Sequence, residues 1–150
     1  MTDIVHVIQL AVAPVFLISG VAGILTVMTN RLARIIDRGR VLAVMKDLTA
    51  DEAAAVAEEQ AVLGRRGQVV NVAIWFCTIT GVFIAVVIMM LFVTVFFGFD
   101  ATAVVALLFI LGMLCFSVSL ICFLREITLA THATRFDPAG AVKRRPRTKP

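Results

Sequence analysis

The sequence predicts an all-α membrane protein with three transmembrane helices and a cytoplasmic, antiparallel helical hairpin between the first and the second. Three long stretches contain no Asp, Glu, Lys or Arg, namely residues 4–30, 67–99 and 101–124. As helices they would be roughly 40, 50 and 36 Å long, and the hydrocarbon core of a bilayer is about 30 Å thick. In addition, 61% of the 150 residues are hydrophobic, more than one soluble domain of this size can bury.

The distribution of basic residues predicts the orientation in the membrane. All 14 Lys and Arg residues lie either between the first two spans or at the end of the third span and beyond it. By the positive-inside rule, both regions are cytoplasmic, so the N-terminus is outside and the C-terminus inside. The first apolar run has no basic cluster before it and exceeds the length of a secretory signal, so we expect it to be retained.

The first span, residues 4–30, carries small or polar residues at helical spacing. This stripe comprises Gln9, Ser19, Gly23, Thr26 and Asn30. The other spans have similar stripes, Asn71, Thr78, Gly81 and Ala85 in the second and Gly112, Cys115, Ser119, Cys122 and Glu126 in the third. Such residues let helices approach closely in lipid. Either the three stripes meet and hold one protomer together, or the first one faces a symmetry axis and lines a pore.

Residues 31–66 are predicted to form the hairpin. The first helix continues to Met45 because apolar residues recur on one face of the segment, and residues 46–48 form the turn. The pattern Thr49-Ala50-Asp51-Glu52 is typical of a capping box that starts the second arm. Gly64 and Gly67 allow a bend, but the absence of proline between residues 50 and 99 favours one continuous helix of nearly fifty residues.

A cluster of polar residues is expected where the three spans reach the cytoplasmic interface. Its members are Arg31, Arg34, Arg38, Asn71, Arg125 and Glu126. If Glu126 faces the bundle it needs a cation, and Arg31, Arg34 or Arg38 could supply one. The cluster is interpreted either as an ion pair that fixes helix register, or as a cytoplasmic mouth or a site for anions and lipid headgroups.

The net charge of +4 comes from the tail, because acidic residues nearly neutralise the hairpin. Residues 137–150 have two prolines and no apolar periodicity, which predicts a disordered basic tail after a membrane domain of residues 1–136. We expect this tail to contact anionic lipid headgroups, and we expect no nucleic acid partner.

The sequence offers little for catalysis, and we expect neither an enzyme nor a metal or other cofactor. His6 and His132 lie on opposite sides of the predicted membrane, so they cannot share a metal. Cys77, Cys115 and Cys122 lack the close pairing of a metal or haem motif. No glycine-rich phosphate loop is present, and no serine, histidine and acid lie at one depth.

Two segments carry a resemblance to a known family. They are residues 8–20 (IQLAVAPVFLISG) and residues 29–38, of which Thr-Asn-Arg-Leu-Ala-Arg at 29–34 is the most specific part. Together with the re-entry at residues 65–71, they resemble an uncharacterised family of small bacterial inner-membrane proteins, classed as a domain of unknown function. The likeness covers roughly residues 5–134. It implies a multi-pass protein of the bacterial inner membrane and transfers no catalytic residue.

Two functional hypotheses follow. In the working hypothesis, a homo-oligomer forms an ion channel lined by the first span. In the alternative, the protein is a non-catalytic scaffold or accessory subunit that recruits a protein partner through its hairpin and tail. A three-helix protomer leaves much of its polar stripe unpaired unless copies associate, so both hypotheses favour self-association.

Overall fold

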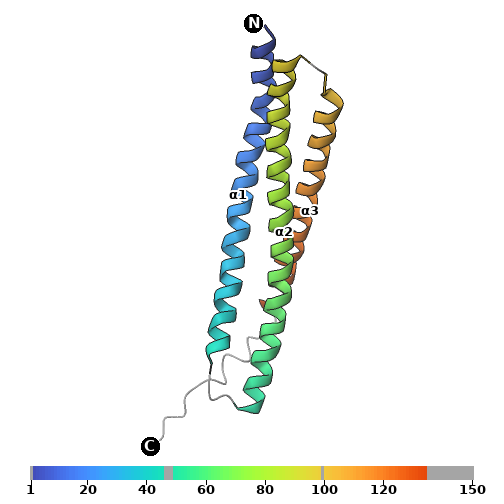
Figure 1. Cartoon of the computed structure of the whole chain (residues 1–150). Coiled ribbons are helices and arrows are strands. Elements are labelled where there is room, and N and C mark those ends of the chain that lie inside the picture. The colour runs from blue at the N-terminus through green and yellow to red at the C-terminus, as the bar shows by residue number, and fades with distance from the viewer. Residues whose placement is uncertain (1, 46–48, 99, 135–150) are drawn as a thin grey trace, which may run out of the picture.

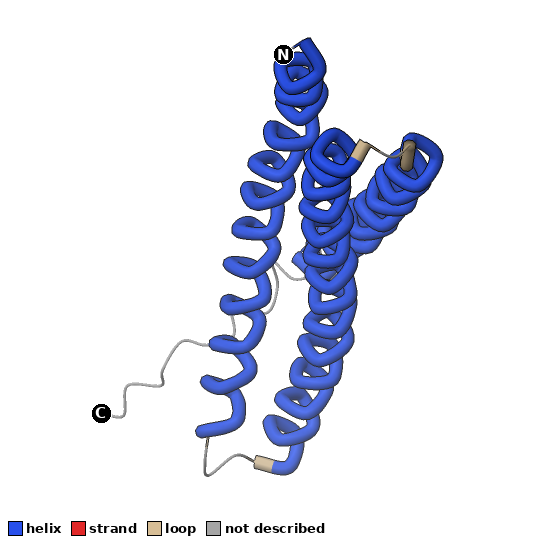
Figure 2. The backbone as a smooth tube through the Cα atoms, turned by 45° about the horizontal axis from the view of Figure 1, so that its top comes forward, coloured by secondary structure: helices blue, strands red, loops and turns tan. Residues whose placement is uncertain are grey.

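The computed structural model describes residues 2–45, 49–98 and 100–134, and these residues form three α-helices. They are α1 (Thr2–Val44), α2 (Ala50–Phe97) and α3 (Thr102–Thr134). Figures 1 and 2 show α2 lying between α1 and α3, with the N-terminus at the end where α2 meets α3. All three helices are long and apolar enough to cross a membrane. The all-α, multi-pass prediction is therefore confirmed, while the cytoplasmic hairpin and the side on which each terminus lies stay predictions.

The long helices follow from local sequence signals. Thr49 and Glu52 form the predicted capping box, in which Thr49 N donates to the Glu52 carboxylate at 3.0 Å and Glu52 N donates to Thr49 Oγ1 at 3.4 Å. From there α2 runs without a break through Gly64 and Gly67, as one helix of 48 residues. It ends at Gly98, whose φ of 68° is accessible to glycine at little cost. The predicted turn at residues 46–48 lies outside the described residues.

The middle helix packs through a stripe that runs the length of its apolar half. The buried residues of this stripe follow one another at alternating intervals of three and four residues. They are Val70, Ala73, Cys77, Thr80, Ile84 and Val87. This spacing keeps one side of a helix turned toward its neighbours, as in a coiled coil. Both α1 and α3 pack along α2, and α1 buries Pro14, Val21, Met28 and Leu42 at multiples of seven residues. The central buried cluster therefore combines heptad-spaced side chains of α1 and α2, and partly buried side chains of α3 pack against it.

The contact between α2 and α3 is close because a glycine lies in it. A Cβ atom at Gly112 would lie 3.1 Å from the Cβ of Phe83. Thr80 Oγ1 donates to the carbonyl of Gly112 at 3.3 Å, and Ser119 Oγ donates to the carbonyl of Ala73 at 2.7 Å. Small residues on α3 thus allow hydrogen bonds between helices within the apolar region.

The connection from α2 to α3 is short and polar. Asp100 accepts hydrogen bonds from the backbone N and the hydroxyl of Thr102, at 2.9 and 2.7 Å. These hydrogen bonds hold the pKa of Asp100 below its usual range. The side chain therefore stays ionised at the start of α3, where the helix dipole favours negative charge.

Candidate functional site

The three helices meet around one buried carboxylate, that of Glu126 on α3. Its side chain is fully buried, with an exposed fraction of 0%. Oε1 of Glu126 lies 2.9 Å from Nη2 of Arg66 on α2, and Oε2 lies 3.4 Å from Nε of Arg31 on α1. The Arg31 guanidinium also lies over the ring of Phe123, 5.7 Å from its centroid. Each helix thus contributes one member of a three-residue ion cluster.

The two arginines explain how an ionised carboxylate can be buried here. Removing a single charge from water costs several kcal/mol unless an opposite charge and hydrogen bonds offset it. The Arg31 and Arg66 side chains are 33% and 21% exposed, so each holds the buried carboxylate and still reaches the surface. The cluster therefore fixes the register and the rotation of all three helices at this depth.

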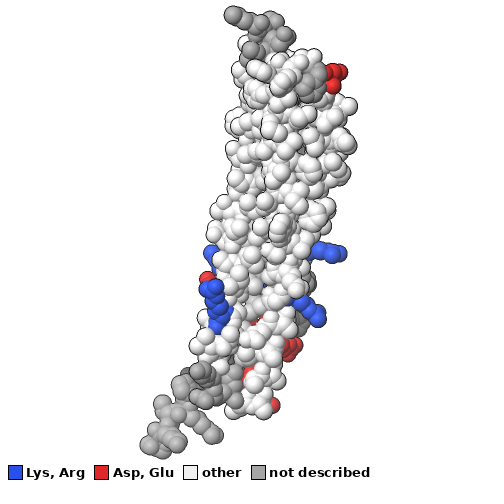
Figure 3. All heavy atoms as spheres, in the orientation of Figure 1, with Lys and Arg blue, Asp and Glu red and all other residues white. Residues whose placement is uncertain are grey.

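Beside the cluster lies a pocket of about 250 Å³. It is lined by Arg31, Arg34, Ile35, Arg38, Leu63, Arg66 and Glu126. Arg38 of α1 makes a bidentate ion pair with Glu59 of α2, at 2.8 and 3.2 Å. Figure 3 shows Arg side chains in the half of the molecule nearer the connection from α1 to α2, below a largely uncharged surface. The pocket thus presents guanidinium groups at the boundary between the apolar and the charged parts.

The structure brings together part of the cluster expected from the sequence. Arg31 and Glu126 form the expected ion pair, and Arg34 and Arg38 line the neighbouring pocket. Asn71 and Arg125 are exposed and do not line it. Sequence reasoning missed Arg66, which lies nearer to the Glu126 carboxylate than Arg31 does. The feature that could have indicated Arg66 is the Arg65-Arg66 pair directly before the second charge-free stretch, at the same predicted depth as Arg31.

The stripe of the first span lies on the outside of the protomer. Gln9, Ser19, Gly23, Thr26 and Asn30 are all exposed, on the side of α1 opposite the residues that pack on α2. Two further exposed residues, Val12 and Phe16, complete the spacing, so that the row 9, 12, 16, 19, 23, 26, 30 alternates steps of three and four. This α1 row, as we call these seven residues, has the spacing of a helix that packs against another helix.

The backbone along the α1 row is open to a neighbour. A Cβ atom at Gly23 would meet nothing within 4 Å. The hydroxyls of Ser19 and Thr26 donate to carbonyls of their own helix, at 3.4 and 2.9 Å. The row therefore combines room for close approach with polar groups that a second helix or water can contact.

The three stripes do not meet inside one protomer, which corrects that interpretation of the sequence. Asn71, Thr78 and Ala85 of the second stripe are exposed, and Gly81 is half-buried. Only the third stripe packs within the bundle, where Gly112, Ser119 and Glu126 are buried and Cys115 and Cys122 are half-buried. Within the described residues, α2 turns its heptad stripe inward instead of its small polar residues.

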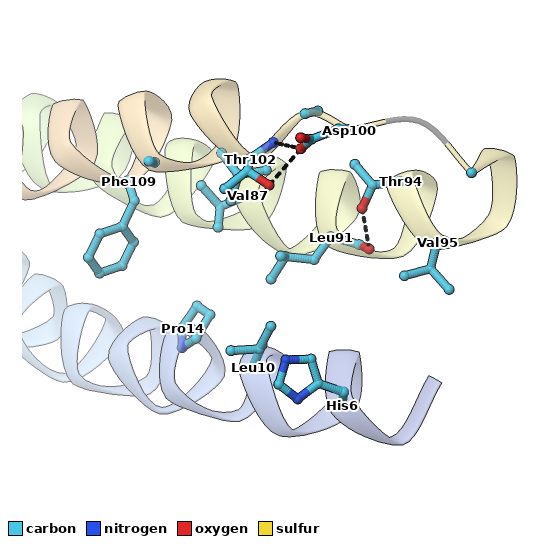
Figure 4. Close-up of a pocket in the computed structure, with 14 residues that line it drawn as sticks. His6, Leu10, Pro14, Val87, Leu91, Thr94, Val95, Asp100, Thr102 and Phe109 are labelled. Atoms are coloured by element: carbon cyan, nitrogen blue, oxygen red, sulfur yellow. Dashed lines mark hydrogen bonds between the residues drawn. The ribbon is translucent and has the colours of Figure 1, made fainter. Parts of the chain in front are cut away.

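A larger pocket, of about 780 Å³, lies between the helices at the opposite end (Figure 4). His6, Leu10 and Pro14 of α1 face Val87 and Leu91 of α2 across it, and α3 contributes Phe109. Its lining is mostly apolar, and Asp100 at its rim is already hydrogen-bonded to Thr102. This pocket is therefore a mostly apolar space at the end of the helices opposite the Glu126 cluster.

A family model described as "Protein of unknown function (DUF2721)" matches residues 11–136. The chain belongs to this family. The match contains the α1 row from Val12 onward, the Glu126 cluster and the pocket beside it, whereas Gln9 of the row and His6 and Leu10 of the larger pocket precede it. No match was found among curated proteins or among solved structures.

Proposed function

We propose that several copies of this protein assemble in a membrane and conduct ions through a pore lined by the α1 row. One observation carries the proposal: the small and polar residues of the first span face away from their own protomer. In the protomer they are covered by neither α2 nor α3. An axis shared by several copies would bring the rows together and surround them with protein.

Association through α1 has a physical basis in lipid. Hydrocarbon tails are as apolar as leucine, so helices associate through close backbone approach and hydrogen bonds. Gly23 leaves room for that approach, and the alternating spacing of the row matches a left-handed crossing of neighbouring helices. The apolar rows of a purely lipid-facing helix need neither property.

The order of residues along the row gives the pore a defined profile. Gln9 lies at one mouth, followed by Val12 and Phe16, and the side chain of Phe16 is 74% exposed. Ser19, Gly23, Thr26 and Asn30 then form a polar section that leads to Arg31 and Arg34. Rings of Val12 and Phe16 would form an apolar constriction, the type of gate that closes by excluding water.

The first test is the number of protomers in the detergent-solubilised complex, measured by native mass spectrometry. We expect one closed ring of roughly four or more copies, since fewer helices cannot surround an aqueous path. Reconstituted vesicles containing the ring should then show ion flux that protein-free vesicles prepared in parallel lack. A monomer or a dimer, or a ring without flux, would contradict the pore.

A second candidate is a scaffold that recruits a partner through two charged arms, residues 31–44 of α1 and residues 50–64 of α2. It is favoured by the surface of the second arm, where the described residues 50–58 are all exposed apart from the half-buried Val56. Asp51, Glu52 and Glu58 give this surface negative charge, so a partner would present basic residues.

The arms can be removed to test the scaffold. Replacing residues 38–58 by a short Gly-Ser turn should abolish co-purification of a stoichiometric partner and leave membrane insertion intact. The matched control exchanges only the exposed Arg125 of α3, outside the replaced segment, for Gln and should retain the partner. If the variant without arms retains the same partner, the scaffold is wrong.

A further inference from the structure

The pocket beside Glu126 has a large excess of positive charge. Its lining contains four arginines, Arg31, Arg34, Arg38 and Arg66, and one acid, Glu126. Four positive charges and one negative charge leave +3, and Glu59, which pairs with Arg38 from outside the lining, lowers this to +2. Arg34 makes no ion pair with any residue that the structure describes. Among the described residues, the lining and its ion-pair partners therefore leave this pocket with an excess of positive charge.

Hydrogen-bonding capacity is also left over. Nε of Arg66 is buried and has no acceptor among the described residues, although Nη2 of the same side chain binds Glu126. A guanidinium carries five N–H donors, and Arg31, Arg38 and Arg66 use only part of theirs on Glu126 and Glu59. A buried donor without an acceptor costs free energy, so the pocket favours a ligand rich in acceptor oxygens.

The pocket lies at the depth of lipid headgroups. Arg31 is the first charged residue after the charge-free residues 4–30, and Arg66 directly precedes the charge-free residues 67–99. Glu126 follows residues 101–124 at the end of the third stretch. Charged side chains at the ends of three spans mark the boundary between hydrocarbon and headgroups. At this boundary the phosphate groups of the bilayer are the most abundant anions.

We propose that this pocket is a binding site for an anionic phosphate group, held by guanidiniums of α1 and α2 and positioned beside the Glu126 cluster. Arginine suits this ligand because its planar group donates two parallel hydrogen bonds to phosphate oxygens. Ile35 and Leu63, the apolar members of the lining, can contact the part of the ligand that adjoins the phosphate. Glu126 makes ion pairs with Arg31 and Arg66 and thereby orients these donors, while its Oε2 is buried without a hydrogen-bond donor among the described residues and is the one acidic group of the lining.

The two sources of such a phosphate are an anionic lipid headgroup and free phosphate, and one titration separates them. Full-length protein in neutral detergent is titrated with dihexanoyl phosphatidylglycerol, and bound lipid is counted by native mass spectrometry. The same titration with dihexanoyl phosphatidylcholine, which has equal acyl chains and no net charge, measures the contribution of the chains. Inorganic phosphate is then added to displace the bound phosphatidylglycerol.

The decisive comparison is between Arg34→Gln and Arg40→Gln. Both substitutions remove one positive charge from an exposed position on α1, but only Arg34 lines the pocket. Arg34 has no ion pair with a described residue, so its substitution should leave the fold intact. We expect Arg34→Gln to weaken phosphatidylglycerol binding about tenfold, the typical effect of one charge-assisted hydrogen bond, and Arg40→Gln to change it less than about twofold.

The outcomes separate clearly. Tenfold weakening in Arg34→Gln without displacement by inorganic phosphate identifies a lipid headgroup, and the same weakening with displacement identifies free phosphate. The proposal is overturned if Arg34→Gln and Arg40→Gln bind phosphatidylglycerol equally. Equal binding of phosphatidylcholine and phosphatidylglycerol by the unsubstituted protein would overturn it as well. None of these readouts depends on whether copies of the chain form a pore.

Discussion

Replacing Glu126 by alanine should destabilise the folded bundle by about 3 kcal/mol, because it leaves Arg31 and Arg66 without their shared carboxylate. The acid is fully buried, and the substitution also opens a cavity where three helices meet. Partial exposure of the two arginines lets them turn toward headgroups, so we expect a loss at the lower end of the range for buried ion pairs.

The measurement is equilibrium unfolding in mixed detergent micelles, with Glu59→Ala as the matched control. Glu59 also pairs with an arginine, but its side chain is 43% exposed and that of Arg38 is 51% exposed. Exposed pairs of this kind contribute less than about 1 kcal/mol. We expect Glu126→Ala to lower the free energy of unfolding several times more than Glu59→Ala. Equal losses would show that Glu126 is not the central contact of the three helices.

The helices could be predicted from the sequence, but their packing faces could not. Charge-free stretches and the Thr49–Glu52 capping box predict where helices run, because lipid and backbone hydrogen bonding leave few alternatives. In a soluble helix, polarity marks the exposed side. Here Ile84 is buried and Val82 is 59% exposed, although both are apolar. Ile84 packs against protein, whereas Val82 faces the surface that lipid would cover. Hydropathy therefore does not show which side of α2 packs inward.

The candidate site shows the same limit. An acid at the end of an apolar span needs a cation, so an ion pair of Glu126 with Arg31, Arg34 or Arg38 is predictable from sequence, and the structure has Arg31 in this place. Arg65 and Arg66 are neighbours in the chain but point in directions about 100° apart around α2. The rotation of α2 about its own axis therefore decides which of them faces Glu126. The spacing of the small residues in α1 is likewise visible in the sequence. Whether such residues face their own protomer or the outside depends on tertiary packing.

Gly23→Leu or Ser19→Leu should abolish ion flux in reconstituted vesicles if the α1 row lines a pore. Both residues are exposed, and one added isobutyl group per copy would fill the polar section of the path at a single level. Flux is measured in vesicles with equal amounts of inserted protein, and native mass spectrometry checks the assembly of each variant. The matched control is Ala22→Leu, which is equally exposed but lies about 100° away from Gly23 around α1.

The two row substitutions separate assembly from conduction. In the proposed ring Gly23 allows close approach of a neighbouring helix, so Gly23→Leu should release smaller species as well as stop flux. The hydroxyl of Ser19 donates to the carbonyl of Val15 in the same helix. Ser19→Leu should therefore leave the ring assembled and block only the path. Ala22→Leu should change neither property, because position 22 faces lipid in the proposed ring. If the assembled Ser19→Leu variant conducts like the unsubstituted protein, the α1 row does not line the path, and its spacing serves only to join copies.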